Sequence, residues 1–163
     1  FPPPKVPFVF NLASQNKHIA KKSYNHVKLA LKNCNLLDAN YYSFHAGFLC
    51  DLKISELGKK IKNRKLYNRE KSITSFLNRV VKLSKIAKKY NITLLIENNV
   101  LTLKNYEEFK GNPLLMCDPI EILRISKKLP KNVKLLIDVA HLKVSSRTLK
   151  FDPKDVFYKC KHI

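Results

Sequence analysis

The chain has 163 residues, 45% of them hydrophobic and 27% charged, and this composition is typical of one globular domain rather than of a disordered segment. Lys and Arg total 32 against 12 Asp and Glu, so the formal net charge of +20 favours anionic partners over basic ones. No apolar run approaches the roughly 18 residues of a membrane span, which excludes an integral membrane protein, and four widely spaced cysteines without a C-x-x-C pair favour reduced thiols in a cytoplasmic protein over a zinc ribbon or disulfide scaffold.

The predicted elements alternate between short apolar runs and longer amphipathic stretches. The short runs are rich in β-branched and aromatic residues, as in buried strands, and the longer stretches repeat their apolar residues at helical spacing. Strands are predicted over residues 6–10, 41–45, 92–97 and 133–138, with a fifth beginning at 161–163. Helices are predicted over residues 17–36, 72–90, 119–129 and 152–158. Residues 48–70 are predicted to be a loop with some helix, and residues 101–119 a loop.

This β-α alternation indicates a parallel sheet. Its strands are continuous apolar runs rather than alternating ones, which is how strands covered by helical crossovers on both faces look in a sequence. The chain has only three glycines and no G-x-G-x-x-G or Walker-type loop, so a nucleotide-binding doubly wound fold has no motif support.

The excess of basic residues has two explanations, a surface for anions or nucleic acid and a plain compositional bias. Lys supplies 27 of the 32 basic residues and Arg only 5. Lys is encoded by A/T-rich codons, whereas sites that hold phosphate or read bases favour the bidentate Arg side chain. The densest basic stretch, residues 53–71, is therefore expected to be a solvated face, and the sequence assigns it no role.

Polar side chains end three of the predicted strands. His45 ends the second, Glu97 the third and Asp138 the fourth, with His141 three residues later. Histidine nitrogen combined with carboxylate oxygen suits Zn, Mn, Fe or Co, and an oxygen-rich set suits Mg or Mn. Each residue also has a structural explanation: a hydrogen-bonded core histidine, a solvated strand end, or an N-cap in Asp138-x-x-His141. Their joint occurrence at strand ends favours a shared metal site.

Three motifs in this order resemble a known superfamily. They are Phe44-His45-Ala46-Gly47, Leu95-Ile96-Glu97-Asn98 and Leu136-Ile137-Asp138-Val139-Ala140-His141, preceded by Phe8-Val9-Phe10-Asn11-Leu12-Ala13. The set resembles the xylose-isomerase-like TIM-barrel superfamily over nearly the whole chain, and is most similar to its sugar phosphate isomerase and epimerase branch, with endonuclease IV as a related branch.

The resemblance implies roles for the same four residues. In the epimerase-like branch, Glu97 and Asp138 would bind a divalent metal (Mn, Zn, Co or Mg), Glu97 would also be the catalytic acid/base, and His141 and His45 would contact the substrate. In an endonuclease IV-like protein, His45, Glu97, Asp138 and His141 would all bind metal. Members of that branch carry a ligand histidine where this chain has Lys5, which weakens the nuclease alternative.

The fold expected from the resemblance is a parallel (β/α) barrel of TIM type that is partial, with about five strands of eight. A complete barrel usually has about 250 residues, so residues 1–163 are expected to form a single domain from the middle of a longer barrel. The first hypothesis is a metal-dependent isomerase or epimerase of a sugar or sugar phosphate, working through an enediol-like intermediate. The alternatives are an abasic-site phosphodiesterase acting on DNA and a non-catalytic barrel remnant that self-associates or meets a completing chain segment.

Overall fold

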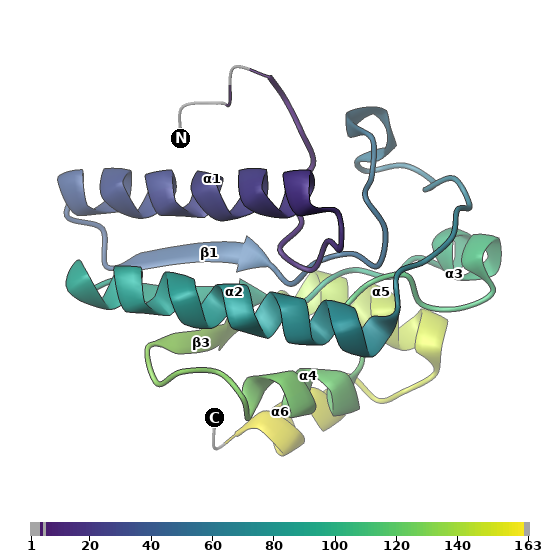
Figure 1. The fold of residues 1–163 in the computed structure, drawn as a ribbon. Coiled ribbons are helices and arrows are strands. Elements are labelled where there is room, and N and C mark those ends of the chain that lie inside the picture. Colours follow the sequence, from purple (N-terminus) through teal and green to yellow (C-terminus); the bar gives the residue numbers. More distant parts are fainter. Residues whose placement is uncertain (1–3, 5, 162–163) are drawn as a thin grey trace.

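A parallel three-stranded sheet forms the centre of the computed structural model, which describes residue 4 and residues 6–161 (Figure 1). Strands β1 (Tyr41–His45), β2 (Thr93–Glu97) and β3 (Val133–Leu136) are hydrogen-bonded in the order β1-β2-β3. Both pairings are parallel, which confirms the predicted sheet type. The carboxyl end of β1 faces the side of the molecule on which helix α3 (Leu103–Phe109) lies (Figure 1).

The register of the sheet places the ends of neighbouring strands level with one another. His45 of β1 pairs with Glu97 of β2, and Glu97 pairs with Leu136 of β3. Paired residues of parallel strands project to the same face, so His45 and Glu97 share one face of the sheet. The preceding pair, Phe44 and Ile96, projects to the opposite face and is buried.

The two long helices begin at asparagine caps. The side chain of Asn16 accepts hydrogen bonds from the backbone at the start of α1 (Lys17–Leu36), and Asn68 does the same for α2 (Arg69–Lys89). Both helices follow the predicted bounds closely, and they pack against each other and the sheet. The residues that they bury include Ala20, Val27, Leu31, Phe76, Val80 and Leu83.

The shorter elements are the 3₁₀ helix η1 (Ile54–Glu56), α3 (Leu103–Phe109), α4 (Pro119–Ser126), α5 (Val139–Leu149) and α6 (Lys154–Cys160). Of the shorter helices, α3 and α5 lie on the side of the molecule to which β1 points, and α4 and α6 lie below β3 in the view of Figure 1. Helix α4 begins at Pro119, and the carboxylate of Asp118 accepts from the Ile120 and Glu121 amides, as expected of its N-cap.

Two hydrophobic clusters support the fold. The larger lies between the sheet and the helices and includes Leu12, Phe76, Leu94, Ile96 and Ile122. The smaller lies under the segment that follows β1 and consists of Cys50, Ile61, Leu101, Leu114 and Cys117. This second cluster gives the loops at the carboxyl ends of the strands a core of their own.

The predicted first strand at residues 6–10 is wrong, because these residues form no strand. Pro7 has no amide proton for a sheet ladder, and Val6 is 67% exposed. The aromatic residues that suggested a strand pack through their rings instead: Phe10 lies 5.8 Å from the Phe44 ring centroid, and Phe8 lies 5.9 Å from the His26 centroid.

Other departures concern helices and the chain end. The predicted loop over residues 101–119 contains α3, and α5 was not predicted. At the predicted fifth strand, Lys161 is instead the C-cap of α6, while residues 162–163 lie outside the described part. The described residues therefore hold three strands rather than about five.

The structure also bears on the expectations about the cysteines and about membrane spans. All four cysteines are free thiols, and burial raises the pKa of Cys50 to about 11. Among the described residues, no helix combines the length and apolar character needed to cross a bilayer.

Candidate functional site

Three of the four predicted site residues meet where the strands end. His45 and Glu97 are the last residues of β1 and β2, and His141 lies in the first turn of α5, just beyond β3. Oε1 of Glu97 lies 3.8 Å from Nδ1 of His45 and 3.5 Å from Nδ1 of His141. The two imidazole rings lie 5.4 Å apart between centroids. Glu97 thus stands between two histidines that are 96 residues apart in the sequence.

These three side chains can offer one ligand atom each within a small space. One nitrogen or oxygen from each of His45, Glu97 and His141 lies within 4.8 Å of the other two. Two imidazoles and one carboxylate are borderline ligands that suit Zn, Mn, Fe or Co. The side chain of Glu97 is 18% exposed and that of His45 46%, so the group is open to a ligand.

His141 is oriented by the backbone beside Glu97. Its Nδ1 lies 3.1 Å from the carbonyl oxygen of Asn98. Because a carbonyl oxygen only accepts, this contact is a hydrogen bond when Nδ1 carries the proton, and Nε2 then keeps its lone pair. A backbone carbonyl that fixes the tautomer in this way is a common partner of a metal-binding histidine.

Asp138 lies beside the cluster and caps α5. Its Oδ1 accepts from the His141 amide at 2.9 Å, and its Oδ2 lies 3.8 Å from Nε2 of His141. The hydrogen bond from the His141 amide, helped by the nearby imidazoles, holds the pKa of Asp138 below its ordinary value. Asp138 is not among the three residues whose ligand atoms lie within 4.8 Å of one another. The N-cap explanation of Asp138-x-x-His141 is therefore correct, and the carboxylate also borders the site.

Buried asparagines hold the loops of the site, and the sequence did not assign them this function. Oδ1 of Asn98 accepts from the Asp138 amide at 2.7 Å, and its Nδ2 donates to the Asp138 carbonyl at 3.2 Å. Asn99 donates to the carbonyls of Gly47 and Leu115. Asn11 bonds both the amide and the carbonyl of Phe48. The sequence signal that pointed to Asn98 and Asn99 was their position, since both polar residues follow an apolar strand.

Comparison with known proteins places the chain in a family. A family model described as a xylose isomerase-like TIM barrel matches residues 2–161. The chain belongs to this family. No curated protein matches the sequence significantly.

Solved structures share the xylose isomerase-like fold at low sequence identity. A D-tagatose 3-epimerase-like protein is 21% identical with a TM-score of 0.66, and the match covers 96% of this chain and 50% of that one. D-psicose 3-epimerase from Clostridium cellulolyticum H10 is 17% identical with a TM-score of 0.58, covering 82% and 40%. An L-ribulose 3-epimerase is 14% identical with a TM-score of 0.60, covering 85% and 40%. The chain therefore spans half or less of the length of these proteins, and its fold is that of a partial barrel.

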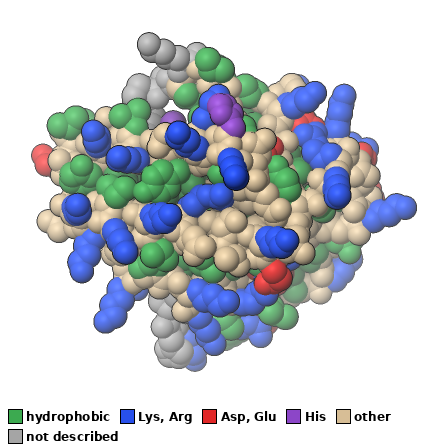
Figure 2. All heavy atoms as spheres, in the orientation of Figure 1, with side chains coloured by type: hydrophobic (Ala, Val, Ile, Leu, Met, Phe, Trp, Pro, Cys, Tyr) green, Lys and Arg blue, Asp and Glu red, His purple; other side chains and the backbone are tan. Residues whose placement is uncertain are grey.

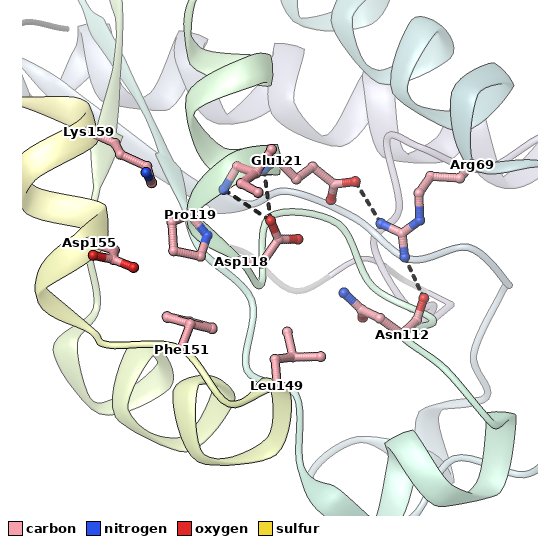
Figure 3. Close-up of a pocket in the computed structure, with 10 residues that line it drawn as sticks. Arg69, Asn112, Asp118, Pro119, Glu121, Leu149, Phe151, Asp155 and Lys159 are labelled. Carbon is pink, nitrogen blue, oxygen red and sulfur yellow. Dashed lines mark hydrogen bonds and ion pairs between the residues drawn. The ribbon is translucent and has the colours of Figure 1, made fainter.

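A pocket between α4 and α6 holds none of the four predicted site residues of this xylose isomerase-like chain (Figure 3). Three of its polar side chains, those of Arg69, Asp118 and Glu121, are used in structural contacts. Arg69 donates to Glu121 at 2.7 Å and to the Asn112 carbonyl at 2.5 Å, and Asp118 caps α4. Because these contacts join the start of α2 to α4, we assign this pocket a structural role.

The positive charge is dispersed over the face that Figure 2 shows. Lys and Arg side chains are scattered across it among hydrophobic and polar atoms rather than gathered in one patch. This distribution fits a solvated surface better than a nucleic-acid site. Lys5, the residue that argued against the nuclease branch, lies outside the described residues.

Proposed function

We propose that this chain is part of a divalent-metal-dependent enzyme that isomerises or epimerises a sugar or sugar phosphate. The observation that carries the proposal is the convergence of His45, Glu97 and His141 at the carboxyl ends of the strands. Active sites of (β/α) barrels lie at this end, and three solved structures of this fold are named as sugar 3-epimerases or as similar to one. Neither the DNA alternative nor the self-association alternative gains support from these comparisons.

The proposed metal ligands are Glu97, His45 and His141, with Asp138 as a further ligand from the adjacent helix cap. The three clustered donors fit a borderline divalent cation, because two are imidazole nitrogens and one is a carboxylate oxygen. When bound, such a cation supplies Lewis acidity that polarises a carbonyl and acidifies the neighbouring C–H bond.

Glu97 is the proposed catalytic residue for proton transfer. Its carboxylate would take the proton from the carbon beside the substrate carbonyl to give an enediol-like intermediate. In an isomerisation Glu97 would return the proton to the neighbouring carbon, whereas an epimerisation needs a second proton donor on the opposite face of the first carbon. Its Oε1 lies 3.5 Å from Nδ1 of His141 and 3.8 Å from Nδ1 of His45. The ring nitrogen of His45 that does not bind the metal would bind a substrate hydroxyl group, because the His45 side chain is 46% exposed.

Metal stoichiometry of the purified full chain is the first test. After dialysis against Zn or Mn, we expect about one ion per chain by elemental analysis, with loss in Glu97→Gln and His141→Ala and reduced retention in Asp138→Ala. His18→Ala is the matched control, because His18 is an exposed histidine at the start of α1. No bound metal, or equal loss in the control, would overturn the proposed centre.

Turnover is the second test. We expect Glu97→Gln to abolish epimerisation of ketose sugars and their phosphates more completely than it weakens substrate binding. Two or three ions per chain together with incision of an abasic DNA duplex would instead favour the phosphodiesterase alternative.

A further inference from the structure

A pocket of about 740 Å³ opens beside His45. One wall comes from residues 56–61, in the basic segment that the sequence left without a role, and another from residues 102–105 at the start of α3. Asn99, two residues after the end of β2, also lines the pocket. The volume lies within the range of small-molecule sites, which is about 300–1,000 Å³. The pocket is thus continuous with the candidate centre through His45.

The two walls are joined by hydrogen bonds that need no ligand. Oδ1 of Asn105 accepts from the Ile61 amide at 2.9 Å. Glu108 accepts from the Asn63 amide at 3.1 Å and pairs with Nζ of Lys60 at 2.5 Å. Ile61 is buried in the small hydrophobic cluster under this segment. The pocket is therefore preformed by contacts between η1, its following loop and α3.

The charges that line the pocket do not cancel. Its one carboxylate, Glu56, accepts from the backbone amides of Lys53 and Lys62 and pairs with Arg64, so its negative charge is already compensated. Burial alone would raise the pKa of Glu56, but these donors hold it below its ordinary value, and the group stays ionised.

Three lysines line the same pocket, and one of them is neutralised. Lys60 is paired with Glu108, whereas no ion pair within the described part of the chain engages Lys59 or Lys104. These two ammonium groups come from opposite walls, Lys59 from the loop after η1 and Lys104 from α3. Glu107 and Glu108 line another hollow with Lys104, but neither forms an ion pair with it. Two ammonium groups without an ion-pair partner at one preformed cavity form a complement to a single anionic group.

From this arrangement we infer that the pocket binds the anionic group of a charged sugar, with Lys59 and Lys104 as its counter-charges. This inference rests on the proposed sugar chemistry and narrows its substrate class, since both ammonium groups attract an anionic sugar and neither attracts a neutral one. Phosphate and carboxylate share the required charge, and the experiment distinguishes them.

The test is ligand binding to the full chain by calorimetry at low salt, with D-fructose 6-phosphate, D-glucuronate and D-fructose as probes. We expect the phosphorylated or carboxylated probe to bind at least tenfold more tightly than D-fructose, and the Lys59→Gln/Lys104→Gln double variant to lose about tenfold of that affinity. Lys127→Gln/Lys128→Gln is the matched control, because it removes the same charge from two exposed lysines after α4.

Each outcome decides the inference. Loss with D-fructose 6-phosphate alone identifies phosphate, and equal loss with D-glucuronate identifies a general anion site. Equal affinity for D-fructose, no binding of either anion, or the same loss in the control variant overturns it. Binding is measured without turnover, so the two proposals can fail separately. Anion binding without any epimerisation would reject the proposed function only. Epimerisation that is unaffected in the double variant would reject only the inference that the pocket binds the anionic group.

Discussion

Replacing Asn11 by alanine should be among the most destabilising single changes outside the large hydrophobic core. Asn11 is 1% exposed. Its Oδ1 accepts from the amides of Ala13 and Phe48 at 3.0 and 3.1 Å. Its Nδ2 donates to the carbonyls of Phe48 and Cys50 at 3.0 and 3.3 Å. The alanine variant would leave these four buried or half-buried backbone groups without their partner.

The magnitude follows from the number of groups left unpaired. At about 1 kcal/mol for each lost hydrogen bond, the four contacts amount to about 4 kcal/mol. For a chain of this size, a loss of that magnitude lowers the melting temperature by roughly 8–16 °C. Residues 46–51 follow directly on His45, so we also expect the metal affinity of the variant to fall.

Thermal and urea unfolding of the two purified proteins would measure this effect. Asn25→Ala is the matched control, since Asn25 is an exposed asparagine within α1 and alanine is the better helix former. The control should be as stable as the parent or slightly more so. A loss below about 1 kcal/mol in Asn11→Ala, or an equal loss in the control, would refute the reasoning from hydrogen bonds.

Three further changes have expected outcomes. Gly47→Ala should cost about 2–3 kcal/mol by thermal unfolding, because Gly47 has a φ of +145° and an added Cβ would lie 2.7 Å from the Ala13 Cβ; an unchanged melting temperature would contradict this. Glu56→Gln should destabilise the chain most at pH 7. Because the pKa of Glu56 is depressed in the folded state, its contribution is present above about pH 4.3 and disappears as the pH falls through the lower folded value. Urea unfolding at pH 7 and pH 3 should therefore show the difference from the parent shrinking, and a constant difference would reject the role of the Arg64 ion pair and its neighbouring donors. Phe76→Ala, at a fully buried position, should cost about 3–5 kcal/mol by the same assay, and a loss under 1 kcal/mol would show that the core cluster is assigned wrongly.

Local patterns predicted the elements whose residues carry their own structural signal. Strand β2 was predicted to within one residue because Leu94-Leu95-Ile96 is a continuous apolar run that ends in Glu97. Helix α1 matched its predicted bounds, with an asparagine cap and helical spacing. Residues 6–10 show the same apolar character yet form no strand, because Pro7 interrupts the ladder and the aromatic rings pack against side chains.

The candidate site also has a part that local sequence patterns predict and a part that they do not. The convergence of His45, Glu97 and His141 could be predicted, because parallel strands bring their carboxyl ends together and His141 lies in the helix turn just beyond β3. The pocket lysines could not be predicted, since Lys59 and Lys104 line one pocket only because Asn105 and Glu108 bond the loop after η1. Those contacts span more than 40 residues and have no local pattern.

The supporting asparagines suggest why amides occupy these positions. Asn11 bonds both the amide and the carbonyl of Phe48, and Asn98 bonds both the amide and the carbonyl of Asp138. Each side chain thus makes the paired donor and acceptor contacts that a neighbouring strand would make, at the point where the strands have ended. An aspartate there could only accept, and its charge would lie near Asp51 or Asp138. A neutral amide satisfies both backbone groups and leaves the carboxylate of Glu97 as the negative charge between the two histidines.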